Sequence, residues 1–72
     1  MTPKQVGKTI RDARRTLHLR QDELAGAANV GVRFIVDLEA GKPTAQLGKA
    51  LAVMDALGCK LTIQPPSSPK RP

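Results

Sequence analysis

The sequence predicts a mainly all-α fold, with four helices followed by one short strand near the C-terminal end. Apolar residues recur every three or four positions through most of the 72-residue chain, which is typical of helices that bury one face. Glycine or asparagine stands where each of the last three helical patterns stops, and both residues commonly end helices. After Gly58 the apolar period changes to two, as in a half-buried strand.

The first helix is expected from about Pro3 to Leu17. Thr2 can serve as its N-cap and Gln5 completes a capping box, while proline suits the first helical position. Arg14 lies inside the apolar stripe of this helix, so it needs an ionic partner if it is buried. The stripe predicted to face the core consists of Val6, Ile10, Ala13 and Leu17.

Two short helices are expected next, at residues 21–28 and at about residues 32–40, separated by Asn29-Val30-Gly31. The second of these divides into two faces when its residues are spaced at about 100°. The inner face holds Phe34, Ile35 and Leu38, and the outer face holds Val32, Arg33, Val36, Asp37 and Ala40.

The fourth helix is expected from about Ala45 to Leu57, with Thr44 as its N-cap and Gly58 as its stop. Its predicted apolar stripe is Leu47, Ala50, Leu51, Met54 and Leu57.

A strand is expected over residues 59–64, with Cys59, Leu61 and Ile63 on its apolar face. Nothing else in the chain resembles a strand, so its backbone needs a second copy of the chain or a partner protein. Residues 65–72 are rich in Pro and Ser and are expected to form a disordered basic tail. The predicted domain therefore spans residues 1–64.

Composition narrows the functional classes. A net charge of +6 favours a polyanionic partner, although a basic surface can also serve solubility alone. One histidine, His18, and one cysteine, Cys59, offer little for catalysis, so we predict no enzyme, metal, cofactor or small-molecule substrate. We expect His18 to be solvated and Cys59 to pack as a small apolar residue. The lone cysteine suits the cytoplasm, and no apolar run reaches the roughly 18 residues that span a membrane.

Two short helices joined by a turn, the second with a mixed outer face, are typical of a helix-turn-helix. Residues 21–28 would support residues 32–40, the recognition helix, in the major groove of DNA. Ala25 and Ala28 supply small side chains at the helix crossing, and Arg33 supplies a donor outside. A plain helical bundle also needs small residues at crossings, so the pattern alone leaves that alternative open.

Several motifs resemble the lambda-repressor-like (Xre-type) helix-turn-helix family over residues 3–58. They are Gln21-Asp22-Glu23-Leu24-Ala25, Ala28-Asn29-Val30, Ile35, Leu38-Glu39 and Gly41-Lys42. Residues 32–44, followed by a strand where the family usually has a fifth helix, resemble the HipB-type antitoxins. This resemblance implies a homodimer whose strand pairs across the two chains. It also implies binding to double-stranded operator DNA, repression of the protein's own operon and neutralisation of a HipA-like kinase toxin.

The resemblance assigns base reading to Val32, Arg33 and Asp37, and the helix face adds Val36. Arginine can bond guanine, valine can touch a thymine methyl, and aspartate can accept from cytosine. An acid near phosphates more often orients Arg33 or excludes other sequences, so Asp37 keeps both interpretations.

Gln21 and Lys42 match phosphate-contacting positions of the family. Arg20 replaces the usual Ser or Thr cap and can approach a phosphate instead. Arg14 and Glu39 match a buried ion pair between the first and third helices, the alternative being a solvated arginine.

Two residues weaken the match or remain open. Gly31 replaces the usual hydroxyl cap of the recognition helix, which puts its first turn in doubt. Phe34 is assigned to the core because it is the only aromatic residue, although it could equally lie near the groove wall.

Two other functions compete with DNA reading. Asp37 and the capless Gly31 motivate a protein-interaction module, an antitoxin subunit with little sequence-specific DNA binding. An RNA-binding protein is disfavoured because the usual stacking aromatics are missing apart from Phe34.

Overall fold

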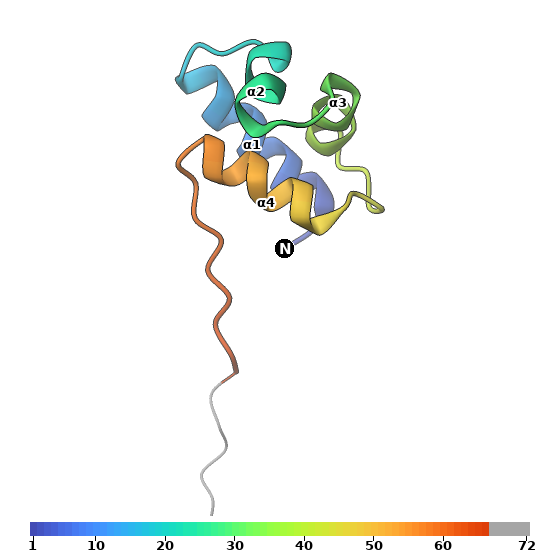
Figure 1. The fold of residues 1–72 in the computed structure, drawn as a ribbon. Helices are drawn as coiled ribbons and strands as arrows, with labels where there is room; N and C mark the ends of the chain where they lie inside the picture. The colour runs from blue at the N-terminus through green and yellow to red at the C-terminus, as the bar shows by residue number, and fades with distance from the viewer. Residues whose placement is uncertain (67–72) are drawn as a thin grey trace, which may run out of the picture.

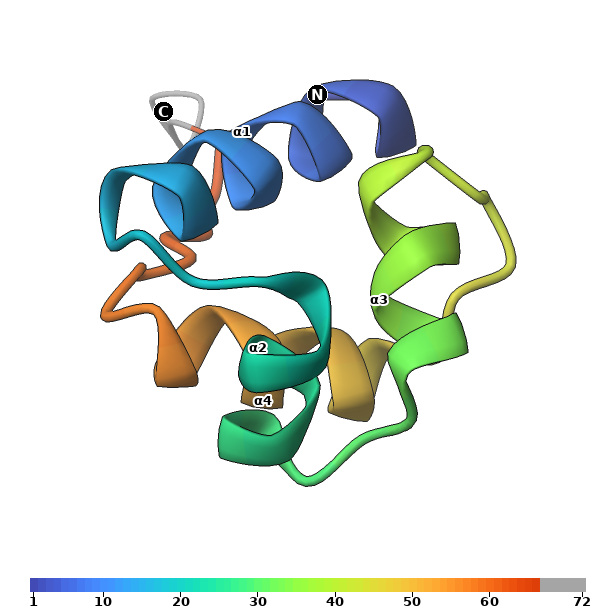
Figure 2. The same cartoon turned by 90° about the horizontal axis from the view of Figure 1, so that it is seen from above.

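A computed structural model of the protein describes residues 1–66 and contains four α-helices (Figure 1). They are α1 (Pro3–Thr16), α2 (Gln21–Ala28), α3 (Val32–Glu39) and α4 (Leu47–Ala56). Helix α2 packs against both α3 and α4, while α1 packs against α3 (Figure 2). The fold is all-α over the described residues, and α1 and α4 support the pair formed by α2 and α3.

All four helices end in the same kind of turn, in which one residue adopts the left-handed conformation. These residues are His18, Asn29, Gly41 and Gly58, with φ between 58° and 85°. In each turn the N–H of this residue donates to the carbonyl oxygen three residues earlier. The N–H of the following residue donates to the carbonyl oxygen five residues before it, which completes a Schellman motif. The sequence predicted the stops at Asn29, Gly41 and Gly58. No such sign marks His18 in the sequence, because the left-handed conformation is sterically unfavourable for histidine and a histidine therefore does not indicate a helix end.

The helix starts agree with the sequence at α1 but not at α4. Thr2 accepts from the Gln5 N–H at 3.1 Å, and the Thr2 N–H donates to the Gln5 side chain at 2.8 Å, which completes the capping box. The prediction that Thr44 caps the fourth helix is wrong, since α4 begins at Leu47 with Gln46 as its N-cap. The chain needs residues 43–46 to cross from α3, and Ala45 packs against the core on the way.

The core lies where the four helices meet. Its buried apolar residues are Ile10, Leu24, Ala25, Ala28, Ile35, Leu38, Ala50, Val53 and Leu57. Three residues expected there are instead exposed, namely Leu17 at 50%, Leu47 at 67% and Leu51 at 41%. Leu17 follows the last turn of α1. Helix α4 is rotated relative to the prediction, because Val53, which lies outside the predicted stripe, is fully buried.

Residues 59–66 follow α4 without regular secondary structure. Cys59, Lys60 and Leu61 lie beside α4, and the chain then runs away from the helices (Figure 1). The strand predicted over residues 59–64 is therefore not formed in this single chain, because a strand needs a neighbour to accept and donate its backbone hydrogen bonds. Cys59 packs partly against the core, as expected, whereas Ile63 is 82% exposed. Most of the predicted tail, residues 67–72, lies outside the described residues.

Candidate nucleic-acid interface

The outer face of α3 carries the four residues predicted to read bases. Val32 and Val36 are exposed, and the side chain of Arg33 is 85% exposed. Asp37 is half-buried in the last turn of the helix. Its carboxylate lies between two cations, with Arg33 Nε at 3.4 Å and Lys42 Nζ at 3.6 Å. This surface therefore combines apolar side chains with a cation–anion–cation cluster.

Helix α3 begins without a side-chain cap. Gly31 is its N-cap, and the Phe34 N–H donates to the Gly31 carbonyl at 3.1 Å. The first turn of α3 thus forms through this backbone bond, although the family's usual hydroxyl is missing.

The start of α2 brings Arg20 and Gln21 together. Arg20 Nε lies 3.1 Å from Asp22 Oδ1, and the hydrogen bond lowers the pKa of Asp22 below its ordinary value. The Arg20 N–H donates to Glu23 Oε1 at 2.8 Å, so a glutamate completes half of a capping box although arginine provides no acceptor. In the free protein, the Arg20 side chain is therefore held along the first turn of α2.

A buried network links the first three helices. Arg14 donates twice to Glu39, from Nε at 2.6 Å and from Nη2 at 3.0 Å, and also to the Leu19 carbonyl at 2.8 Å. The hydrogen bonds to Glu39 raise the pKa of Arg14 above its ordinary value. Gln21 Nε2 donates to the same carboxylate at 3.2 Å. Among the described residues, no buried side-chain nitrogen or oxygen lacks a hydrogen-bond partner. The network fixes the end of α3 relative to α1 and the start of α2.

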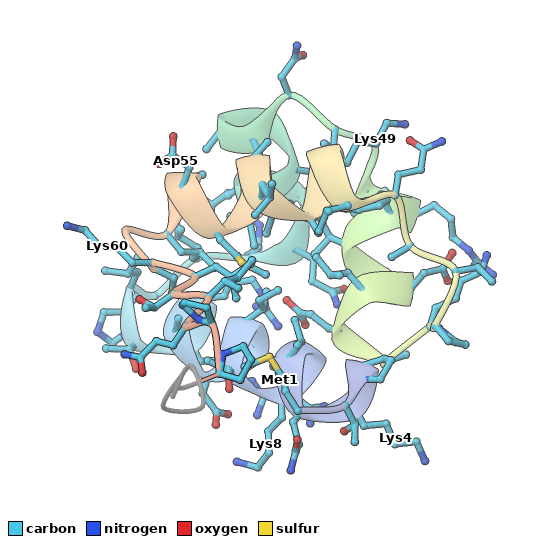
Figure 3. The ribbon with its side chains drawn as sticks, turned by 90° about the horizontal axis from the view of Figure 1, so that it is seen from below. Met1, Lys4, Lys8, Lys49, Asp55 and Lys60 are labelled. Carbon is cyan, nitrogen blue, oxygen red and sulfur yellow. The ribbon has the colours of Figure 1, made fainter. Side chains whose placement is uncertain are left out.

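Phe34 lies at the edge of the core, packed against buried residues yet not itself fully buried. The Nζ of Lys49 lies 5.9 Å from the centre of its ring, within the range of a cation–π contact. Lys49 projects from the first turn of α4 (Figure 3), and it lines a hollow with Asp37 and Lys42. The sequence analysis missed Lys49. Nothing in the sequence indicated it, because the fourth helix was expected to begin at Ala45, which puts Lys49 beyond the first turn.

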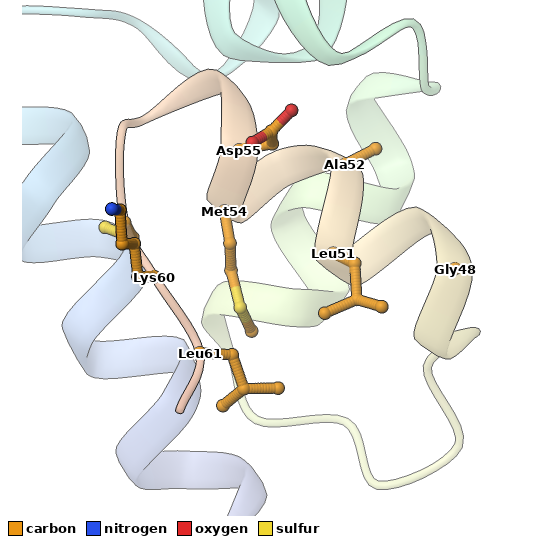
Figure 4. Close-up of a pocket in the computed structure, with 8 residues that line it drawn as sticks. Gly48, Leu51, Ala52, Met54, Asp55, Lys60 and Leu61 are labelled. Carbon is orange, nitrogen blue, oxygen red and sulfur yellow. The ribbon is translucent and has the colours of Figure 1, made fainter. Parts of the chain in front are cut away.

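An apolar groove lies between α4 and the segment that follows it (Figure 4). Leu51, Met54 and Leu61 supply its apolar lining, while Asp55 and Lys60 stand at its polar positions. The groove does not include α3, so the domain carries two separate exposed surfaces.

No group of three or more potential metal ligands occurs within residues 1–66. In the same part of the chain, no helix is long and apolar enough to cross a membrane.

The paired helices α2 and α3, braced by α1 and α4 with one face of α3 exposed, define a helix-turn-helix domain. Residues 10–64 match the family described as helix-turn-helix. A protein of Sinorhizobium fredii named "Uncharacterized HTH-type transcriptional regulator y4mF" is 56% identical over 70 residues, covering 97% of this chain and 92% of that protein. The protein thus belongs to the Xre-type, lambda-repressor-like helix-turn-helix family, a non-enzymatic family of DNA-binding transcriptional regulators.

Proposed function

We propose that the protein is a cytoplasmic, homodimeric repressor of the HipB antitoxin type. It binds double-stranded operator DNA, represses its own operon and neutralises a HipA-like kinase toxin. The observation that carries DNA reading is the exposed outer face of α3, held in place by the Arg14–Glu39 ion pair. The name of the Sinorhizobium fredii relative, a transcriptional regulator, supports the same function. The antitoxin part rests on the resemblance of residues 32–44 and of the extended segment after α4.

Each residue on the outer face of α3, and Lys42 in the turn after it, has a distinct role in this proposal. Arg33 reads a guanine through O6 and N7, and Asp37 accepts from a neighbouring cytosine or orients Arg33. The two exposed valines, Val32 and Val36, contact thymine methyl groups. Lys42 binds a phosphate after α3.

The start of α2 supplies the remaining phosphate contacts. The side chain of Gln21 is already bonded to Glu39, so Gln21 offers a phosphate its backbone N–H at the helix N-terminus. Arg20 leaves Asp22 to reach a phosphate, because their ion pair is exposed to solvent and therefore weak.

The second copy of the chain covers the apolar groove beside α4. The same chain supplies both the groove and an extended segment, 59–64, which forms no strand within the described residues and leaves the Ile63 side chain 82% exposed. A two-fold arrangement lets each copy's segment, with Cys59, Leu61 and Ile63, pair with that of the other copy beside the two grooves. It also allows Asp55 of one copy to approach the opposite charge, Lys60, on the other.

The first experiment measures binding of the purified protein to the DNA upstream of its own coding region and to random duplex, at two salt concentrations. A preference of about a thousandfold or more for the upstream DNA is expected of a specific repressor. Arg33→Ala should cost about 1–3 kcal/mol and relax one base position, whereas Lys42→Ala should weaken all duplexes alike. Equal losses on every duplex for Arg33→Ala would refute its role in base reading.

The dimer is tested by measuring mass in solution. Leu51→Glu and Leu61→Glu place a charge in the groove and should yield monomers. Leu17→Glu is the matched control, because Leu17 is also an exposed leucine but lies outside the groove. If both groove variants remain dimers, the interface does not include the groove.

A second candidate function, a protein-interaction module with little sequence-specific DNA binding, is favoured by the position of Asp37. Its carboxylate offsets part of the positive charge of Arg33 and Lys42. Binding to upstream DNA no tighter than to random duplex would support this candidate. Complex formation with the toxin would then persist in Arg33→Ala.

A further inference from the structure

We infer that Asp37 restrains Arg33 and Lys42 in the free protein and thereby weakens binding to DNA of arbitrary sequence. This inference rests on the proposed function and identifies a residue that determines its specificity. It differs from base reading, because Asp37 acts here through the two cations and not by touching a base.

The turn that ends α3 holds the cluster together. The Lys42 N–H donates to the Asp37 carbonyl at 3.0 Å, and Gly41 allows this turn with a φ of 85°. The backbone therefore returns Lys42 to Asp37, while Arg33 lies one helical turn earlier on the same face. Both cations reach the carboxylate without any change in the fold.

The two ion pairs are loose enough to open on DNA. Their N···O distances, 3.4 Å and 3.6 Å, exceed the usual 2.7–3.2 Å of an N–H···O hydrogen bond. The side chains of Arg33 and Lys42 are 85% and 54% exposed, so water and salt screen both pairs.

The helix itself gains nothing from an acid at this position. Asp37 lies in the last turn of α3, where the helix dipole disfavours a carboxylate. Its favourable interactions are with Arg33 and Lys42, which points to a role in controlling those cations.

Binding to random DNA depends on how much phosphate charge the protein neutralises. Three charged groups with a net charge of +1 attract phosphates less than two free cations would. At the correct site Arg33 can donate from its two Nη groups to guanine O6 and N7 while its Nε stays beside Asp37, so the ion pair is kept. On random sequence the ion pair must open before Arg33 can reach a phosphate, so only random binding bears its cost. The carboxylate thus increases the ratio of specific to random affinity.

The test compares Asp37→Asn with Asp12→Asn, a matched control. The control removes the same charge and releases one lysine, because Lys8 Nζ lies 2.9 Å from Asp12 Oδ2 on the exposed side of α1. Asp37→Asn should tighten binding to random duplex about 3- to 10-fold and steepen its salt dependence by about one phosphate. It should leave upstream binding within about twofold, so the specificity ratio falls. Asp12→Asn should change random binding by less than about twofold, and Asp37→Glu, which still reaches both cations, should behave like the parent.

Equal tightening by Asp37→Asn and Asp12→Asn would overturn the inference. So would unchanged random binding in Asp37→Asn combined with a loss at one base position, which is the result expected of a base reader. The same titrations measure how much more tightly the parent protein binds upstream DNA than random duplex. If the parent shows no preference, the proposed function fails, while the comparison on random duplex still decides the role of Asp37.

Discussion

Replacing Gly7 with alanine tests how closely α1 must approach the end of α3. Gly7 is buried in the middle of α1. A Cβ atom added there would lie 2.5 Å from the Leu38 carbonyl oxygen and 2.6 Å from that of Glu39. Both oxygens belong to the backbone of α3 and cannot rotate aside as a flexible side chain can. The two helices must therefore separate, which also disturbs the Arg14–Glu39 ion pair between them.

The expected loss in unfolding free energy follows from this overlap. Ordinary contact begins at 3.4 Å, so the new carbon must retreat by about 0.9 Å, the difference between 3.4 and 2.5 Å. Overpacking of this kind costs about 1–3 kcal/mol, and occasionally more. The gain in helix propensity from glycine to alanine returns up to about 1 kcal/mol. We expect a net loss of about 1–2 kcal/mol, a large share of the roughly 4–11 kcal/mol typical of a domain this size.

Gly26→Ala is the matched control. Gly26 lies in α2, is exposed, and has nothing within 4 Å of an added Cβ. This variant should stabilise the protein by about 0.5–1 kcal/mol. Urea unfolding followed by far-ultraviolet circular dichroism measures both changes. Stabilisation of the same size in Gly7→Ala and Gly26→Ala would refute the close approach of α1 to α3.

Three further changes address the charges and the turns. Glu39→Gln leaves Arg14 without its ionic partner and should cost about 3–5 kcal/mol in urea unfolding, whereas replacing both residues by methionine should cost less. His18→Gly should raise the unfolding free energy by about 1 kcal/mol, because glycine adopts the left-handed conformation without steric cost. The hydrogen bond from Arg20 depresses the pKa of Asp22 below 3.8, so its contribution to stability is present above 3.8 and is lost as pH falls through the lower, folded value. Because solvent screens this exposed ion pair, Asp22→Asn should flatten the acid decline of the urea midpoint only slightly, and a steeper decline would contradict this.

Local signals in the sequence were enough for the elements nearest the interface. The predicted bounds of α2 agree with the structure, and α3 differs by one residue at its end. Asn29 and Gly41 stop these helices as predicted, because left-handed turns select such residues strongly. The position of Arg14 within an apolar stripe also indicated a buried partner.

Features that depend on packing between elements could not be predicted in the same way. Helix α4 has apolar residues on more than one face, so its pattern could not show that Val53 packs inward while Leu47 and Leu51 face out. Nothing near Gly7 in the sequence indicates that the end of α3 lies against it. The strand at residues 59–64 was inferred from alternation alone, which cannot supply the second strand that its hydrogen bonds require.

The two exposed surfaces have separable tasks in the proposed dimer. The Arg14–Glu39–Gln21 network ties α3 to α1 and to the start of α2, so it fixes the proposed base-reading and phosphate-binding groups relative to one another within one copy. The groove beside α4 and segment 59–64 lie outside that network. These residues therefore set the distance between the two copies of α3, and with it the spacing of the half-sites. A substitution that breaks the groove contact should remove the dependence of binding on half-site spacing, while one on α3 should change which bases are read.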